Sequence, residues 1–129
     1  MRSGLPIRVL CLALLASCGA NTPPRFHLAT HLESTAAHGP FEVWADVSDD
    51  AGVARVELLF RTRPPGGSWS EFEGVRMEAL GERVFRASLP AVTSDSTAVE
   101  YELAAIDHDE AVTRYPSEEL VSFVAGAVP

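Results

Sequence analysis

The segment from Phe41 to Val47 alternates apolar and polar side chains at every position. Because successive side chains of a β-strand point to opposite faces, this pattern predicts a strand with one buried and one exposed face. The same period of two returns in Val53–Arg63, Arg83–Leu89 and Ala98–Asp107. After the first eighteen residues, no segment has the 3.6-residue period of an amphipathic helix. The pattern therefore restricts the chain to an all-β fold.

The alternation also assigns side chains to the core and to the surface. An early strand is predicted over Phe26–His31, with Phe26, Leu28 and Thr30 on one face. Trp44 has the opposite parity to its buried neighbours and is expected to point outward. In the four strands above, the residues expected to face inward are Phe41, Val43, Ala45, Val47, Val56, Leu58, Phe60, Phe85, Ala87, Leu89, Val99, Tyr101, Leu103 and Ala105.

Shorter strands and turns complete the pattern. Turn-forming residues separate the strands, as in Asp49–Gly52, Pro64–Ser68 and Gly81-Glu82. Seven or eight short strands, with turns about every eight to twelve residues, predict an antiparallel β-sandwich. The remaining predicted strands are Trp69–Phe72 and Val75–Leu80 on either side of a break at Glu73-Gly74, and a last strand that begins with Val112–Tyr115, is interrupted at Pro116 and is completed by Leu120–Val124.

Three stretches give the predicted sandwich a family resemblance. They are Asp49–Arg61, which has the pattern Asp-Asp-x-Gly-Val-x-x-Val, and the strands Val84–Pro90 and Val99–Asp107. With the flanking strands, about 100 residues resemble the immunoglobulin-like (Ig-like) or fibronectin-type-III-like domains of bacterial surface and exported proteins. The resemblance implies that fold and no particular activity. It ends after Asp107, where His108–Ala111 stands in place of the Gly-Asn turn that often follows in these domains.

The first eighteen residues predict export. Arg2 and Arg8 are basic, Val9–Ala16 is apolar, and the motif Leu15-Ala16-Ser17-Cys18 ends this region. A basic segment before a short apolar run is typical of a signal peptide. The apolar run would cover only about 12 Å as a helix, too little to span a bilayer. The four-residue motif resembles the lipobox of bacterial lipoproteins.

The lipobox resemblance implies a specific modification at Cys18. In that family the cysteine thiol receives a diacylglyceryl group, the signal is cleaved just before the cysteine, and the new amino group is acylated. Two or more acyl chains hold a protein firmly on a membrane. The expected organisation is a signal peptide over residues 1–17, a lipidated tether over 18–24 and a sandwich over 25–129. Ordinary secretion with cleavage near Ala20 and an uncleaved anchor are the alternatives.

The residue after Cys18 bears on the location. In enteric bacteria an aspartate at this position resembles a signal for retention in the inner membrane, whereas this chain has Gly19. We therefore expect an exported, membrane-anchored lipoprotein, periplasmic or at the cell surface. The outer membrane is favoured over the inner membrane.

The chain after the signal is strongly acidic. Without Arg2 and Arg8 it has 8 basic residues, all arginine, against 18 acidic ones, which gives a formal charge of −10. This charge repels phosphate backbones and anionic headgroups, so we expect no nucleic-acid binding and expect membrane contact to come from the lipid anchor. Both cysteines, Cys11 and Cys18, belong to the signal region. The domain is therefore expected to have no disulfide and to depend on its hydrophobic core.

Acidic loops and histidines are the candidates for metal binding. Asp49-Asp50 and Asp107–Glu110 are expected at the same end of the sandwich, where carboxylates could bind Ca²⁺, although turn acids exposed to water are the simpler interpretation. His27 and His31 would lie about 13 Å apart on a strand, too far to share a zinc ion. The four histidines, all expected on the surface, are His27, His31, His38 and His108. We expect no bound metal and no cofactor.

Aromatic side chains are the candidates for binding other molecules. Trp44 points outward by parity and Trp69 lies near a predicted hairpin tip, so either could contact a protein partner or stack on a glycan. Packing of Trp44 onto a neighbouring strand is the alternative. Tyr101 is a candidate for a tyrosine corner, in which its hydroxyl bonds to the backbone.

No catalytic motif is present in the sequence: it has no Gly-x-Ser-x-Gly, no His-Glu-x-x-His and no phosphate-binding loop. We therefore do not expect an enzyme. The expected function is a lipid-anchored cell-envelope protein whose domain is structural or binds an envelope protein. The alternative is a small-ligand module that binds a glycan through Trp44 and Trp69 or Ca²⁺ through the Asp-rich loops.

Overall fold

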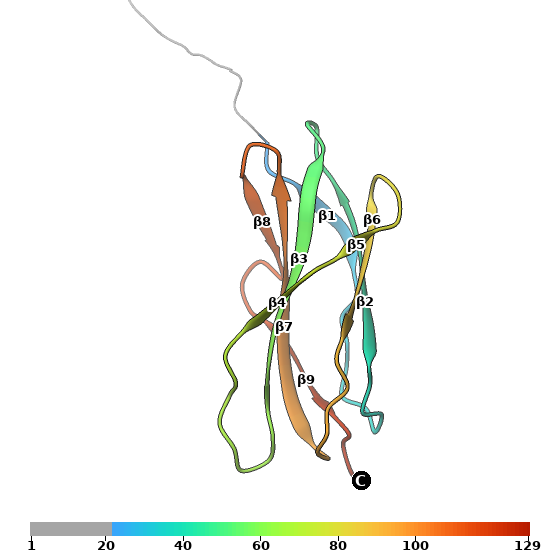
Figure 1. The fold of residues 1–129 in the computed structure, drawn as a ribbon, viewed down its shortest axis with the longest axis vertical. Coiled ribbons are helices and arrows are strands. Elements are labelled where there is room, and N and C mark those ends of the chain that lie inside the picture. The colour runs from blue at the N-terminus through green and yellow to red at the C-terminus, as the bar shows by residue number, and fades with distance from the viewer. Residues whose placement is uncertain (1–21) are drawn as a thin grey trace, which may run out of the picture.

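The structure is a computed structural model that describes residues 22–129. These residues form nine strands in two antiparallel sheets, with no helix among them (Figure 1). Cys18, the predicted signal peptide and the first part of the predicted tether lie outside the described residues. The strands are β1 (Arg25–Ala29), β2 (Phe41–Ser48), β3 (Val53–Arg63), β4 (Glu73–Arg76), β5 (Glu78–Ala79), β6 (Val84–Leu89), β7 (Thr97–Asp107), β8 (Val112–Tyr115) and β9 (Val121–Ala125).

The strand order is that of an Ig-like sandwich. One sheet has the order β1-β2-β6-β5, and the other has the order β4-β3-β7-β8, with β9 following β8 along the same side of β7. These orders correspond to strands A-B-E-D and C′-C-F-G of the Ig-like fold, with β8 and β9 sharing the place of strand G. The predicted β-sandwich is confirmed. It has nine strands because two of the expected strands are each divided in two. The expected strand Val75–Leu80 is divided between β4 and β5, and the expected last strand is divided into β8 and β9.

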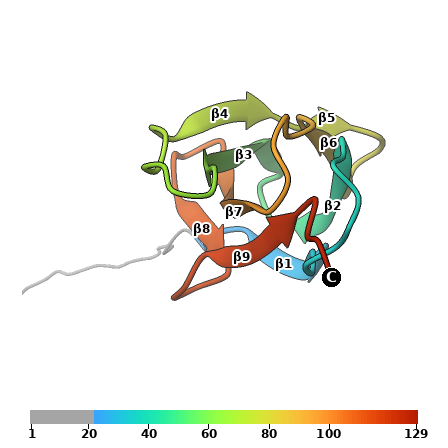
Figure 2. The same ribbon diagram turned by 90° about the horizontal axis from the view of Figure 1, so that it is seen from below.

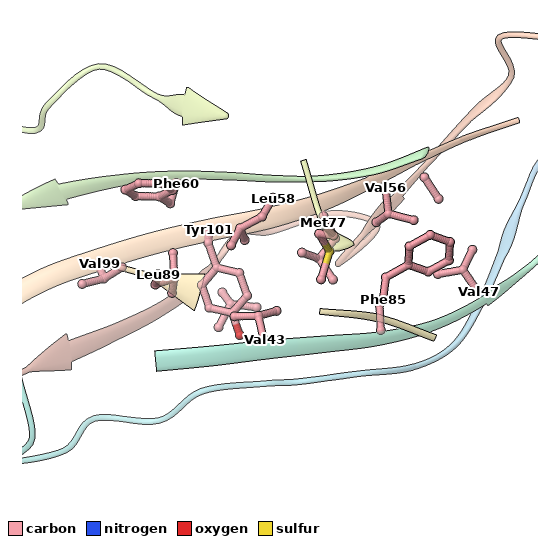
Figure 3. Close-up of a cluster of buried hydrophobic side chains, with 14 of the residues drawn as sticks. Val43, Val47, Val56, Leu58, Phe60, Met77, Phe85, Leu89, Val99 and Tyr101 are labelled. Atoms are coloured by element: carbon pink, nitrogen blue, oxygen red, sulfur yellow. The ribbon is translucent and has the colours of Figure 1, made fainter. Parts of the chain in front are cut away.

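The predicted inward residues fill the space between the sheets, and Figure 3 shows nine of them with Met77, which the sequence did not assign to the core. Val43, Val56, Leu58, Tyr101 and Leu103 have no exposed surface, which confirms the period of two in β2, β3 and β7. Burial of one such apolar side chain contributes about 1.5–3 kcal/mol. Because residues 22–129 contain no cysteine, this packing takes the place of covalent cross-links.

One side of the sandwich is closed by residues 30–37, which leave β1 and cross to the other sheet. The Thr35 amide donates to the Val124 carbonyl at 3.0 Å, and the Gly126 amide donates to the Ala37 carbonyl at 2.8 Å. Thr35 also forms a parallel bridge with Ala125 of β9. The first strand therefore pairs with one sheet and its continuation pairs with the other.

The other side is closed by β4 and β5, which form one continuous segment. β4 pairs with β3, and β5 pairs with β6 in the opposite sheet. Met77 lies at the change of sheet, where its side chain is buried and its amide donates to the Val56 carbonyl at 2.8 Å. Viewed along the sandwich, the two crossing segments and the two sheets enclose the core (Figure 2). Short, covered edges of this kind limit edge-to-edge pairing with other chains.

The prediction that Phe26 and Leu28 share a face is wrong. Phe26 pairs with Val47 and Leu28 pairs with Asp46, so two steps along β1 match one step along β2. The extra residue, His27, makes a β-bulge, which reverses the side-chain parity of the strand. Phe26 packs against the core, whereas Leu28 is 74% exposed on the outer face.

The strand predictions between residues 69 and 80 also need correction. Trp69–Phe72 is an irregular segment, and pairing begins at Glu73, where the sequence predicts a break. Val75–Leu80 is not one strand, because the chain changes sheet at Met77. The Gly81-Glu82 turn is confirmed, since the Leu80 amide donates across it to the Val84 carbonyl at 2.7 Å.

Tyr101 connects the crossing segment to the core. Its ring is wholly buried on β7, while its hydroxyl donates to the Thr30 carbonyl at 2.8 Å and accepts from the Leu32 amide at 3.0 Å. Burial raises the pKa of the Tyr101 hydroxyl to about 12, so the group stays protonated and able to donate at neutral pH. The predicted bond to the backbone is confirmed, but it is not a tyrosine corner. A tyrosine corner bonds a few residues upstream, whereas Thr30 lies 71 residues earlier.

Tyr101→Phe should destabilise the domain, because Thr30 and Leu32 would lose their shared partner in a partly buried place. We expect the free energy of unfolding to fall by about 1–3 kcal/mol, measured by urea denaturation followed by circular dichroism. Tyr115→Phe is the matched control, since Tyr115 contacts Phe26 through its ring. It should change stability by less than about 0.5 kcal/mol. Equal losses in the two variants would contradict a special role for the Tyr101 hydroxyl.

Candidate functional site

The two tryptophans lie on opposite faces of the sandwich. Trp44 is on the outer face of β2, in the first sheet. Trp69 stacks on Arg61 and Arg63, which point outward from β3 in the second sheet. Because the core separates them, one glycan cannot lie across both rings. Each tryptophan belongs to a separate candidate site.

The first site is an arginine–aromatic cluster made of Arg61, Arg63, Trp69 and Phe72. The Arg61 guanidinium carbon lies 4.7 Å from the centre of the Trp69 ring and 4.8 Å from that of Phe72. The Arg63 guanidinium carbon lies 4.9 Å from the centre of the Trp69 ring. These distances are those of cation–π contacts. Glu100 on β7 accepts hydrogen bonds from Arg61 at 2.7 and 2.9 Å, which holds that guanidinium between the two rings.

Part of the arginine–aromatic cluster faces water. Phe72 is 44% exposed, and Arg63 is exposed and has no ion pair within residues 22–129. Trp and Arg are the side chains that most often dominate binding at protein interfaces. Sequence reasoning singled out Trp69 alone. The period of two in β3 placed Arg61 on the outer face, but nothing in the sequence showed that the connection after β3 folds back over it.

The second site is an apolar patch on the outer face of the first sheet. Leu28, Trp44 and Val84 are all exposed, Trp44 by 39%, and they line one open hollow of about 370 Å³. Leu80 is also exposed and lies opposite Val84 in the hairpin between β5 and β6. We call these four residues the Trp44 patch. The outward direction of Trp44 is confirmed, whereas Leu28 joins it only because of the bulge at His27.

Three acidic side chains beside the Trp44 patch have partners, whereas Glu82, in the hairpin between Leu80 and Val84, is exposed and has no ion pair within residues 22–129. Asp46 accepts a hydrogen bond from Arg83 at 2.9 Å, and Glu78 accepts one from Arg86 at 2.9 Å. Glu42 accepts the Trp44 Nε1–H at 3.0 Å. The Arg86 guanidinium carbon also lies 5.5 Å from the centre of the Trp44 ring. Two of the acids around the patch, Asp46 and Glu78, are therefore paired with arginines.

The two Asp-rich loops lie at the same end of the sandwich, as predicted (Figure 1). Asp107, however, is the last residue of β7 and is fully buried. Its Oδ1 accepts hydrogen bonds from the amides of Asp109 and Ala111, each at 2.9 Å, so the carboxylate stabilises the turn. Asp49 similarly accepts a bond from the Ala51 amide at 2.9 Å. Within the described part of the chain, no three His, Cys, Asp or Glu side chains are arranged to hold a metal ion.

The histidines lie on the surface, as predicted. His27, His31, His38 and His108 are all exposed. His27 hydrogen-bonds Ser48 at 2.6 Å, and His38 bonds Asp95 at 2.7 Å. The two contacts involve different partners, Ser48 and Asp95, and have no residue in common.

No protein-family model matches the chain, and no curated protein matches it. Among solved structures, the chain is similar to CopC from Methylosinus trichosporium OB3b, with a TM-score of 0.46 and 12% sequence identity. The similarity covers 82% of this chain and 96% of that one. At this identity the likeness concerns the fold alone. Residues 22–129 include no helix long and apolar enough to cross a membrane.

Asp107→Ala should weaken the domain because two backbone amides would lose a buried carboxylate acceptor. We expect the free energy of unfolding to fall by about 1.5–3 kcal/mol, measured by thermal and urea denaturation. Asp50→Ala removes an exposed acid from the neighbouring loop and should change it by less than about 0.5 kcal/mol. A loss in Asp107→Ala no larger than in this control would show that the carboxylate does not hold the turn.

Proposed function

We propose that this chain is a lipid-anchored protein of the bacterial cell envelope whose single Ig-like domain binds a protein partner. The observation that carries the proposal is the motif Leu15-Ala16-Ser17-Cys18, which follows a basic segment and a short apolar run. It resembles a lipobox in sequence and in position. An anchored domain of this kind acts through its surfaces, and the proposal assigns partner binding to the arginine–aromatic cluster.

The direction of the chain supports a partner site that faces away from the membrane. The described chain begins beside β8, where the Thr113 hydroxyl donates to the Pro24 carbonyl at 2.5 Å. The connection between β3 and β4, which contains Trp69, lies at the opposite end of the sandwich (Figure 1). Six residues from Cys18 to Pro24 span at most about 20 Å. An anchor at Cys18 would therefore hold the first end near the bilayer and leave the Trp69 end accessible.

The composition of the cluster indicates the chemistry of its partner. Arg63 offers an exposed guanidinium without an ion pair, which suits a carboxylate on the partner. Phe72, which contacts Arg61 in the same cluster, offers an exposed ring, which suits an apolar side chain. We propose a partner surface that combines these two groups. A glycan platform formed by both tryptophans is less favoured, because the rings lie on opposite faces.

Cys18→Ser should release the protein from the membrane fraction and abolish its labelling by a fatty acid, because serine cannot take the thioether-linked lipid. The thermal midpoint of the released domain should be unchanged. Cys11→Ser changes the other cysteine and should leave the protein anchored and labelled. A Cys18→Ser protein that remained membrane-bound and labelled would contradict the proposed anchor.

A photo-crosslinking amino acid in place of Phe72 should capture one discrete protein on intact cells. Arg63→Glu in the same chain should lower the yield about tenfold, as expected for the loss of roughly 1–2 kcal/mol at an interface arginine. Arg25→Glu makes the same change of charge at the other end of the sandwich and should leave the yield unchanged. Equal losses from the two charge reversals would contradict a partner site at the cluster.

A further inference from the structure

We infer that the Trp44 patch rests on the surface of the lipid bilayer to which the chain is anchored. The domain would then lie with the outer face of its β1-β2-β6-β5 sheet against the membrane. The inference rests on the proposed anchor at Cys18 and adds to it a second, non-covalent membrane contact. It leaves the arginine–aromatic cluster, on the opposite face, directed away from the bilayer.

The first argument is the concentration of exposed apolar side chains. Seven large apolar side chains are exposed within residues 22–129. Four of them, Leu28, Trp44, Leu80 and Val84, make up the Trp44 patch, and three of these line the same hollow. Scattered exposed apolar residues need no explanation, but a contiguous group marks an interaction surface.

The second argument is the chemistry of Trp44. Tryptophan favours the interface of a bilayer because it combines a large apolar ring with one polar N–H. The Trp44 Nε1–H already donates to Glu42 at 3.0 Å. The N–H can therefore keep this partner if the ring lies at the level of the headgroups, where the Glu42 carboxylate stays hydrated, and Leu28, at 74% exposed, adds aliphatic surface beside it.

The third argument is the length of chain between the anchor and the patch. Pro24 is held against β8 by its bond to Thr113. Cys18 lies six residues before Pro24, within about 20 Å, and Leu28 lies four residues after it, within about 14 Å. The strand that carries Leu28 is the strand into which the tether leads. The patch is therefore within a short reach of any membrane that holds Cys18.

The fourth argument is charge. A chain with a formal charge of −10 is repelled by anionic headgroups, so contact through an acidic surface is unfavourable. At the Trp44 patch, two of the four neighbouring acids, Asp46 and Glu78, are paired with Arg83 and Arg86, which reduces this repulsion. The patch is thus an apolar surface whose neighbouring acids are partly neutralised.

The test measures the depth of each tryptophan separately. Full-length protein, purified from membranes with its anchor, is placed in vesicles of phosphatidylethanolamine and phosphatidylglycerol that contain a brominated phosphatidylcholine. In Trp69→Phe, which retains Trp44, we expect tryptophan emission to shift to shorter wavelength and to be quenched by the bromine. In Trp44→Phe, which retains Trp69 on the opposite face, we expect neither effect.

A second pair of variants tests the patch itself. Leu28→Asp in the Trp69→Phe chain should abolish the quenching of Trp44 while the protein still floats with the vesicles. Val112→Asp is the matched control, since Val112 is 47% exposed but lies outside the patch. It should leave the quenching unchanged. Thermal denaturation of both variants establishes that each remains folded.

The outcomes separate this inference from the proposed anchor. Protein that floats with the vesicles but shows Trp44 no more quenched than Trp69 would overturn the inference and leave the anchor intact. If the protein does not float, the anchor fails, and residues 18–129, which include the whole sandwich, are coupled through the Cys18 thiol to a maleimide lipid for the same quenching measurement. A shift of Trp44 emission without lipid, together with a doubled mass in sedimentation, would assign the patch to a second copy of the chain and overturn the lipid contact.

Discussion

The hydroxyl of Tyr101 is the point at which the two sheets are tied together on one side. Tyr101 stands on β7 in one sheet, and its two partners, Thr30 and Leu32, follow directly after β1 of the other. The bond therefore fixes where the chain leaves the first sheet to pair with β9 of the second. On the other side, the buried Met77 marks a similar change of sheet. With both sides closed, binding surfaces remain on the outer faces and at the two ends.

Much of the fold could be predicted because a two-layer sandwich requires a strict period of two. Because of this requirement, the sequence predicts the strands β2, β3 and β7 and also which of their side chains are buried, including Val56 and Leu103. What the sequence did not show are departures from that period. The bulge at His27 adds one residue without any change of composition, and it moves Leu28 to the outer face. Asp107 has the same inward parity as Val99, Tyr101, Leu103 and Ala105, but its type favours an exposed turn, whereas its carboxylate is buried against that turn.

For a related reason, the candidate sites could be predicted only in part from the sequence. Parity alone placed Trp44 on the surface, but the neighbours that make it part of a patch come from two other strands, β1 and β6, and from a hairpin. Arg61 and Trp69 are eight residues apart and meet because the connection after β3 folds back on its own strand. Contacts of this kind depend on the path of a loop, which periodicity does not describe. The result is a sandwich with two chemically different faces, one apolar around Trp44 and one rich in arginine and aromatic rings around Trp69.

The positions of the two ends have a mechanical consequence. The described chain begins at one end of the sandwich, and the connection that contains Trp69 lies at the other (Figure 1). If the chain is anchored at Cys18 and holds a partner near Trp69, tension between them acts along the length of the strands. Because β1 runs antiparallel to β2 over its whole length, a pull at its start would shear all their hydrogen bonds together. Such a ladder resists force far better than one whose bonds open singly.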